Sequence, residues 1–272
     1  MGALDVKLSP ANLKALQRAV RALENPRLAS KLADYAGQPV NRVLRLMPQI
    51  ASDRLNDLVR STILQCLELA IDSLDEVPSP PSTWLSSTMA GITGGISGAF
   101  GWIALPVELP LTTTLMLRSI ADIARHQGED LSGVAGRLAC MEVFALGGNR
   151  AENKMNIGYY AARAFLARLT GEASAYLLER GVAGASAPVV TSFVTEVSSR
   201  FGIVVSDRVA AGALPVLGAL GGATVNVIFM DHFQRIAEGH FTIRRLERQY
   251  GDEAIQRRYA ELAKQFAAAE EA

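Results

Sequence analysis

The chain has 272 residues, and its 27 lysines and arginines balance its 27 aspartates and glutamates, so its formal net charge is zero. This balance argues against a general nucleic-acid-binding protein, which carries an excess of positive charge. Charged residues make up only 20% of the chain and the mean hydropathy is +0.18, which favours a large buried or membrane-contacting surface. Two cysteines, Cys66 and Cys140, are too few for a disulfide framework, and we expect reduced thiols in the core.

The first predicted helix follows Ser9 and Pro10, because proline suits the first turn of a helix. Its apolar residues recur at helical spacing, with basic residues off that stripe: Leu13, Leu16, Val20 and Leu23 against Lys14, Arg18 and Arg21. Such a basic amphipathic helix either packs on a bundle, which we favour, or lies on anionic lipid. Because the N-terminus lacks an apolar run with a cleavage site, we expect no signal peptide and a cytoplasmic location.

A second clear helix runs from Leu55 to Leu74 and ends before the proline-rich segment 77–81. We place the main boundary there. The chain then divides into N-terminal amphipathic helices over residues 1–77 and a larger helical domain over residues 78–272.

Residues 84–105 form a run without any charged side chain, consisting of 12 apolar residues, 5 glycines and 5 serines or threonines. A helix of that length could cross a bilayer core of roughly 30 Å. Small residues spaced four apart allow another helix to approach closely, and the two tryptophans are spaced about as far apart as the two membrane interfaces. The candidate packing or lipid-contacting residues here are Trp84, Gly91, Gly94, Gly95, Gly98 and Trp102. A hairpin buried within protein would use the same composition.

Residues 105–110 read as a turn bracketed by Pro106 and Pro110, with a second helix starting at the threonine run 112–114. Glu108 lies in this turn. Arg118 and Asp122 are four residues apart on the following helix and can pair on one face.

Further helices are predicted over 131–146, 151–180 and 189–205, the last broken at Gly202. Residues 209–230 form a second uncharged run, in which Gly218 and Gly222 are candidate packing positions. Charged and amphipathic helices over 231–249 and 252–272 follow. The predicted fold is an all-α, multi-helix bundle with a glycine-rich hydrophobic central helical hairpin.

Several of these stretches resemble the EcsC family. The matching residues are Leu105-Pro106-Val107-Glu108-Leu109-Pro110 with Thr112 to Thr114, Leu117-Arg118 and Ile120-Ala121; Gly128-Glu129-Asp130; Glu142 to Gly148; Pro215 to Gly218 with Gly221, Gly222 and Asn226; and Phe241 to Glu247. The resemblance implies a helical, bacterial protein, from a family named for a gene neighbour of an ABC-type exporter linked to protein secretion. It assigns no reaction to any residue.

Catalytic and metal sites find little support in the sequence. The three histidines, His126, His232 and His240, form no H-x-x-x-H pair, no Cys-x-x-Cys is present, and no G-x-S-x-G nucleophile motif occurs. We therefore predict no metal, no cofactor and no catalytic residue.

Charged and polar residues border the two uncharged runs, and we treat Glu108, Arg118, Asp122 and Asn226 as candidate ligand-binding residues. A structural ion-pair network is the favoured alternative, because buried charges need partners. If a ligand binds, an amphiphile with an acidic head on Arg118 fits best.

The leading hypothesis is a non-enzymatic protein at the cytoplasmic side of the bacterial inner membrane, peripheral or inserted. We expect its partner to be membrane lipid, an amphiphile or a membrane protein, and we do not expect nucleic acid. Association into a homo-oligomer is a further alternative. The second hypothesis is a soluble hydrolase in which Glu108, Arg118, His126 or His232 converge on a polar pocket near the 105–110 turn.

Overall fold

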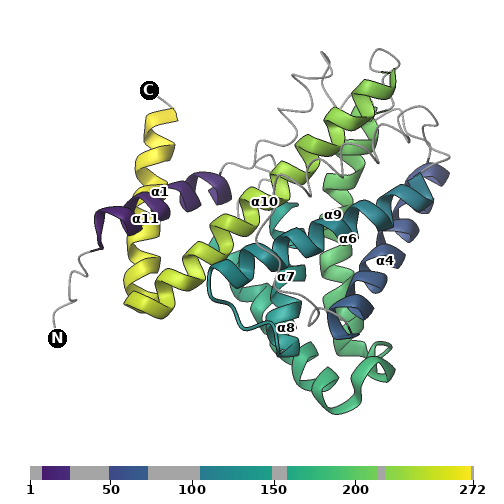
Figure 1. Ribbon diagram of the computed structural model, residues 1–272, viewed down its shortest axis with the longest axis horizontal. Helices are drawn as coiled ribbons and strands as arrows, with labels where there is room; N and C mark the ends of the chain where they lie inside the picture. The colour runs from purple at the N-terminus through teal and green to yellow at the C-terminus, as the bar shows by residue number, and fades with distance from the viewer. Residues whose placement is uncertain (1–7, 25–48, 73–104, 149–157, 213–217, 271–272) are drawn as a thin grey trace.

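The computed structural model describes residues 8–24, 49–72, 105–148, 158–212 and 218–270. Within these ranges the chain forms eight α-helices and one 3₁₀ helix and no strand, which confirms the predicted all-α bundle (Figure 1). The helices are α1 (Pro10–Glu24), α4 (Gln49–Asp72), α6 (Leu105–His126), α7 (Val134–Gly147), α8 (Tyr159–Arg180), η2 (Gly181–Gly184), α9 (Pro188–Gly212), α10 (Gly218–Tyr250) and α11 (Asp252–Glu270).

Helix α10 connects the two sides of the molecule. Its 33 residues span about 50 Å. It contacts α6, α7 and α9 on one side and α1 and α11 on the other, as Figure 1 shows. Helices far apart in the sequence are therefore held together along a single helix.

Helix α1 packs on the bundle through its apolar stripe. Leu16, Val20 and Leu23 are buried against α10 and α11, while Lys14 and Arg18 are exposed. The alternative, in which this stripe lies on lipid, is wrong because the stripe is already covered by protein.

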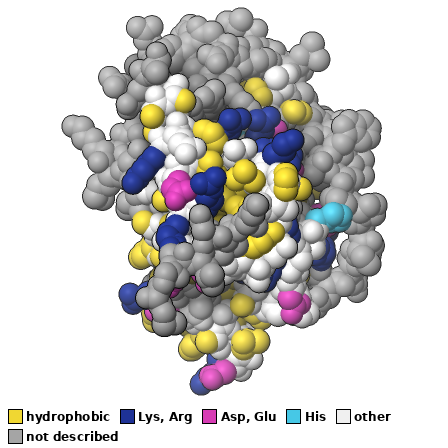
Figure 2. Space-filling view, turned by 90° about the vertical axis from the view of Figure 1, so that its left-hand side faces the viewer, with side chains coloured by type: hydrophobic (Ala, Val, Ile, Leu, Met, Phe, Trp, Pro, Cys, Tyr) yellow, Lys and Arg dark blue, Asp and Glu magenta, His cyan; other side chains and the backbone are white. Residues whose placement is uncertain are grey.

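On the side that carries α1 and α11, basic side chains lie among hydrophobic ones over the described residues (Figure 2).

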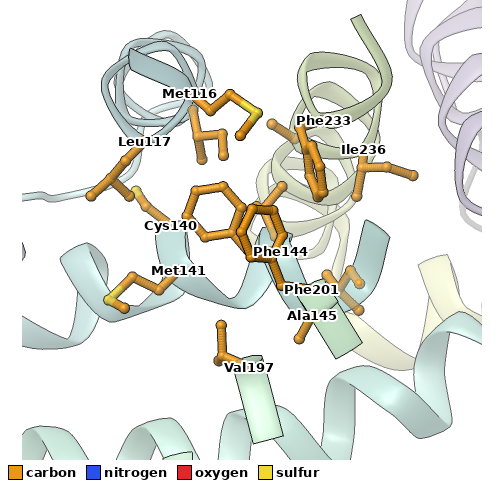
Figure 3. Close-up of a cluster of buried hydrophobic side chains, with 14 of the residues drawn as sticks. Met116, Leu117, Cys140, Met141, Phe144, Ala145, Val197, Phe201, Phe233 and Ile236 are labelled. Atoms are coloured by element: carbon orange, nitrogen blue, oxygen red, sulfur yellow. The ribbon is translucent and has the colours of Figure 1, made fainter. Parts of the chain in front are cut away.

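The core centres on phenylalanines from α7, α9 and α10 (Figure 3). The Phe144 ring lies 4.9 Å from that of Phe201 and 5.5 Å from that of Phe233, and both contacts are tilted or edge-on, as aromatic pairs prefer. Gly147 lets α7 approach α10 here, because a Cβ at this position would lie 2.5 Å from the Phe233 ring. Cys66 and Cys140 are buried free thiols, as expected, and burial raises the pKa of each to about 12.

Helix α6 begins earlier than predicted, so the turn expected over 105–110 is wrong. Pro106 lies in the first turn, where a backbone N–H has no helical partner, and proline costs little there. Pro110 lies inside the helix and forgoes one helical hydrogen bond. The proline pair therefore marks the start of α6 and not a turn before it.

Two further predicted helix boundaries are absent. Helix α9 continues through Gly202, because packing against α4, α7 and α8 outweighs the roughly 1 kcal/mol helix penalty of one glycine. Helix α10 continues through Asp231, which pairs with Arg235 at 2.9 Å. Gly128 and Gly251 follow the ends of helices and have positive φ angles of 75° and 89°, which glycine adopts easily.

Much of the predicted glycine-rich hairpin lies outside the described residues. This applies to the 77/78 boundary and to Trp84, Gly91, Gly94, Gly95, Gly98 and Trp102. The second uncharged run is divided between the end of α9 and the start of α10, and Gly218 and Gly222 lie in the first turns of α10.

Within the described residues, Pro188–Ala210 is long and apolar enough to cross a membrane, judged by length and composition alone. It forms most of α9, which contacts α4, α7, α8 and α10. Core helices of soluble proteins meet the same criterion, so this finding is only weak support for membrane contact.

Candidate functional site

Three helices meet at a buried polar cluster formed by Glu108, Arg208 and Asn226, which we call the border cluster. Arg208 donates hydrogen bonds from Nη2 to the Glu108 carboxylate and from Nε to the Asn226 side-chain oxygen, the latter at 2.8 Å. Asn226 donates from Nδ2 to Glu108 at 2.8 Å. All three are at most 9% exposed. The cluster therefore ties the start of α6 to the end of α9 and the first part of α10.

The surroundings of Arg208 are apolar on one side. Its guanidinium lies 5.2 Å from the centre of the Phe229 ring, within the range of a cation–π contact. Burial lowers the pKa of Arg208, and the charge and hydrogen bond of Glu108 oppose that shift. Burying either of these two charges without the other would be costly.

The structure brings Glu108 and Asn226 together, but Arg118 and Asp122 lie elsewhere. Arg118 is exposed on α6. Asp122 pairs with Arg125 at 3.1 Å, one turn further along the same helix. Burial raises the pKa of Asp122, while the charges of Arg125, His126 and Arg118 oppose the shift. The four candidate residues thus belong to two separate places.

The residues of the hydrolase hypothesis do not converge either. Glu108, Arg118 and His126 lie on one continuous helix, at axial distances of about 15 Å and 12 Å from one to the next. His126 contacts the Asp122 carbonyl, whereas His232 is buried on α10, 2.9 Å from the Gly147 carbonyl. A single pocket that contains these side chains is therefore wrong on geometric grounds.

Two further buried polar pairs lie between α7, α8 and α10. They are Glu142 with Thr170 and Tyr159 with His240, whose α8 residues lie about 16 Å apart along that helix, and we call the two pairs together the inner cluster. Thr170 donates to Glu142 at 2.5 Å, and the Tyr159 hydroxyl lies 3.0 Å from His240 Nδ1. Glu142 Oε2 and His240 Nε2 have no partner among the described residues. Burial raises the pKa of Glu142 to about 7 and lowers that of His240 well below its usual value.

Two ion pairs flank the inner cluster. Arg163 binds Glu247 at 2.7 Å, and Arg244 binds Glu129 through two hydrogen bonds of 2.9 and 2.8 Å. Hydrogen bonds from Arg244 and Arg248 lower the pKa of Glu129, although burial opposes this. These pairs hold the end of α10 against α8 and the turn after α6.

The described residues contain no group of three or more histidine, cysteine or acidic side chains that could hold a metal ion. An open surface hollow of about 430 Å³ lies where α6 and α10 end, and its lining residues are His126, Gln127, Gly128, Arg245, Arg248 and Gln249. Arg245 and Arg248 already bind Gln127 there. We therefore base the candidate site on the border cluster.

The prediction from sequence missed Arg208, the cation of the border cluster. One signal was available, because Arg208 immediately precedes the uncharged run that starts at Val209. A charge at that position in an apolar helix needs a buried partner. The pairing with Glu108, 100 residues away, required the fold.

Comparison with known families gives one result. The model of the EcsC protein family matches residues 10–246, which is most of the chain. No significant match was found among curated proteins or among solved structures. Glu108, Arg208 and Asn226 of the border cluster all fall within the matched region. The chain therefore belongs to the EcsC protein family.

Proposed function

We propose that this protein is a non-catalytic, membrane-associated protein that binds lipid at the end of the molecule where its uncharged runs border the helical bundle. The observation that carries the proposal is the border cluster. Glu108 lies three residues after the first run, Arg208 immediately precedes the second, and Asn226 lies within the second. The cluster thus holds the borders of both runs at one place.

Exposed apolar side chains next to the cluster support the proposal. Val107 is 75% exposed and Leu111 is 47% exposed on the first turns of α6, and Val227, which follows Asn226, is 39% exposed. Burying apolar side chains of this size in a bilayer is favourable by about 1.5–3 kcal/mol each. Each of these partly exposed side chains would gain part of that free energy, and together the three favour peripheral binding.

The proposed location is the cytoplasmic face of the bacterial inner membrane, with lipid as the partner. A role beside an exporter in protein secretion is what membership of the family suggests. Helix α1 does not supply the membrane contact, because its apolar stripe is covered by α10 and α11.

Co-flotation with lipid vesicles tests the proposal. The wild-type protein should float with vesicles of phosphatidylethanolamine and phosphatidylglycerol, and Val107→Asp with Leu111→Asp should reduce the floating fraction at least tenfold. Leu178→Asp is the matched control, since Leu178 is 68% exposed on α8, away from the cluster. Wild-type protein that stays with the aqueous fraction, or equal losses in both variants, would contradict the proposal.

A further inference from the structure

The border cluster leaves a buried hydrogen-bond donor unused. Arg208 uses Nε and Nη2, but its Nη1 has no partner among the described residues. Arginine has five N–H donors in a fixed planar arrangement, so Nη1 cannot rotate to an acceptor while the other two nitrogens remain bound. A buried donor in this state is costly and indicates a place for an additional acceptor.

Thr112 provides a second unused donor nearby. Its hydroxyl is fully buried and has no partner within the described ranges. The neighbouring Thr113 behaves as threonine usually does in a helix and donates to the Leu109 carbonyl at 2.7 Å. Thr112 lies one helical turn after Glu108 and on the same face of α6. Both unused donors therefore flank Glu108.

The net charge of the cluster restricts the acceptor. Glu108 already neutralises Arg208. An anionic head group would bring a second negative charge close to the Glu108 carboxylate. An uncharged oxygen accepts the same hydrogen bonds without this penalty.

We propose that Arg208 Nη1 and Thr112 Oγ1 bind an oxygen of an uncharged glycerolipid head, an ester or hydroxyl oxygen of a diacylglycerol. The acyl chains would follow the exposed apolar side chains of Val107 and Leu111. This inference rests on the proposed membrane association and specifies the lipid class. It replaces the acidic head on Arg118 that the sequence favoured.

Titration of the full chain with lipid, followed by native mass spectrometry, tests this inference. The probes are dioctanoylglycerol and dioctanoyl phosphatidate. Wild-type protein should bind dioctanoylglycerol more tightly than the phosphatidate. Thr112→Val should weaken dioctanoylglycerol binding roughly fivefold, as expected for one lost hydrogen bond, whereas Thr113→Val should leave it unchanged.

Thermal unfolding without lipid separates the two threonines independently. Thr112→Val removes an unsatisfied buried hydroxyl and should leave the Tm equal or higher, whereas Thr113→Val removes a made hydrogen bond and should lower it. Equal binding by Thr112→Val and wild type, or tighter binding of the phosphatidate, would overturn the inference. In that case the wild type would still float with vesicles, so the two proposals fail in distinguishable ways.

Discussion

Helix α10 carries parts of both buried polar clusters, Asn226 in the border cluster and His240 in the inner cluster, about 21 Å apart along its axis. Between them lies the aromatic core around Phe229 and Phe233. In the border cluster the acid Glu108 forms an ion pair with the base Arg208. In the inner cluster the acid is bonded to the neutral hydroxyl of Thr170.

The comparison shows two ways in which one bundle accommodates buried polar groups. In the border cluster an ion pair and an asparagine side chain bond to one another from three helices. Because a buried charge needs its partner, these bonds fix the relative positions of the three helices. A carboxyl group that faces a hydroxyl avoids the cost of burial by keeping its proton. We therefore expect the border cluster to determine stability through its connectivity, and the inner cluster to make stability depend on pH.

The largest effect is expected for Glu108→Ala. Arg208 would remain buried as a charge without its partner, and breaking a buried pair in this way costs about 3–5 kcal/mol. Urea unfolding measures the change in free energy. The control is Glu172→Ala, which removes the exposed pair with Arg168 and should cost less than about 0.5 kcal/mol. Similar costs in the two variants would show that the border cluster does not hold the helices together.

The second largest effect is expected for the pH dependence of stability, through Glu142. Its folded-state pKa of about 7 lies above the ordinary value of 4.5, so the folded protein holds this proton while the unfolded chain releases it. The stability contributed by this group therefore falls as pH rises from about 4.5 to about 7, by on the order of 3 kcal/mol. The groups that face Glu142 are Thr170 and Arg163 of α8, Arg244 of α10 and Glu129 after α6.

Glu142→Gln removes the titration and keeps the shape of the side chain. Its stability relative to wild type should rise between pH 5 and pH 8, as measured by urea unfolding at both values. If the difference between the two proteins is the same at pH 5 and pH 8, Glu142 is not a protonated acid in the inner cluster.

A smaller effect is expected where α7 crosses α10 between the clusters. Gly147→Ala would place a Cβ 2.5 Å from the Phe233 ring, and such overpacking costs about 1–3 kcal/mol. Gly171→Ala on the exposed face of α8 meets no atom within 4 Å and should stabilise the protein by about 0.5–1 kcal/mol. The Tm measured by thermal unfolding should therefore fall for Gly147→Ala and rise for Gly171→Ala. Shifts of both Tm values in the same direction would contradict the close approach of α7 and α10.

The smallest effect is expected for Tyr159→Phe. The substitution removes the hydrogen bond to His240 Nδ1 and should cost about 1 kcal/mol in urea unfolding. The cost should be the same at pH 7 and pH 8, because burial lowers the pKa of His240 well below its ordinary value of 6.5. A strong pH dependence would mean that the histidine, and not Glu142, titrates in this cluster.

The sequence was sufficient to predict the helices and several of their ends. Apolar spacing in α1 predicted the stripe that is buried, and Gly128 and Gly251 mark helix ends because only glycine adopts their positive φ angles easily. The 105–110 turn was wrong because proline both breaks helices and starts them. Local sequence alone does not distinguish these roles of Pro106.

The site was predicted only in part. Glu108 and Asn226 were candidates because they border the uncharged runs, and the structure joins them. Arg118 and Asp122 were chosen for their spacing on one helix, but helical spacing does not show which face a neighbouring helix covers. The pairing of Glu108 with Arg208 and of Glu142 with Thr170 depends on the packing of separate helices, which one sequence does not specify.

The central claim is that the protein meets the membrane where its uncharged runs border the bundle. Hydrogen–deuterium exchange of the wild-type protein, with and without phosphatidylethanolamine and phosphatidylglycerol vesicles, tests it most directly. We predict that vesicles slow exchange in peptides from residues 105–111 and 224–230, and leave those from 159–180 of α8 unchanged. Unchanged exchange in the first two segments, or slower exchange confined to α8, would contradict the account.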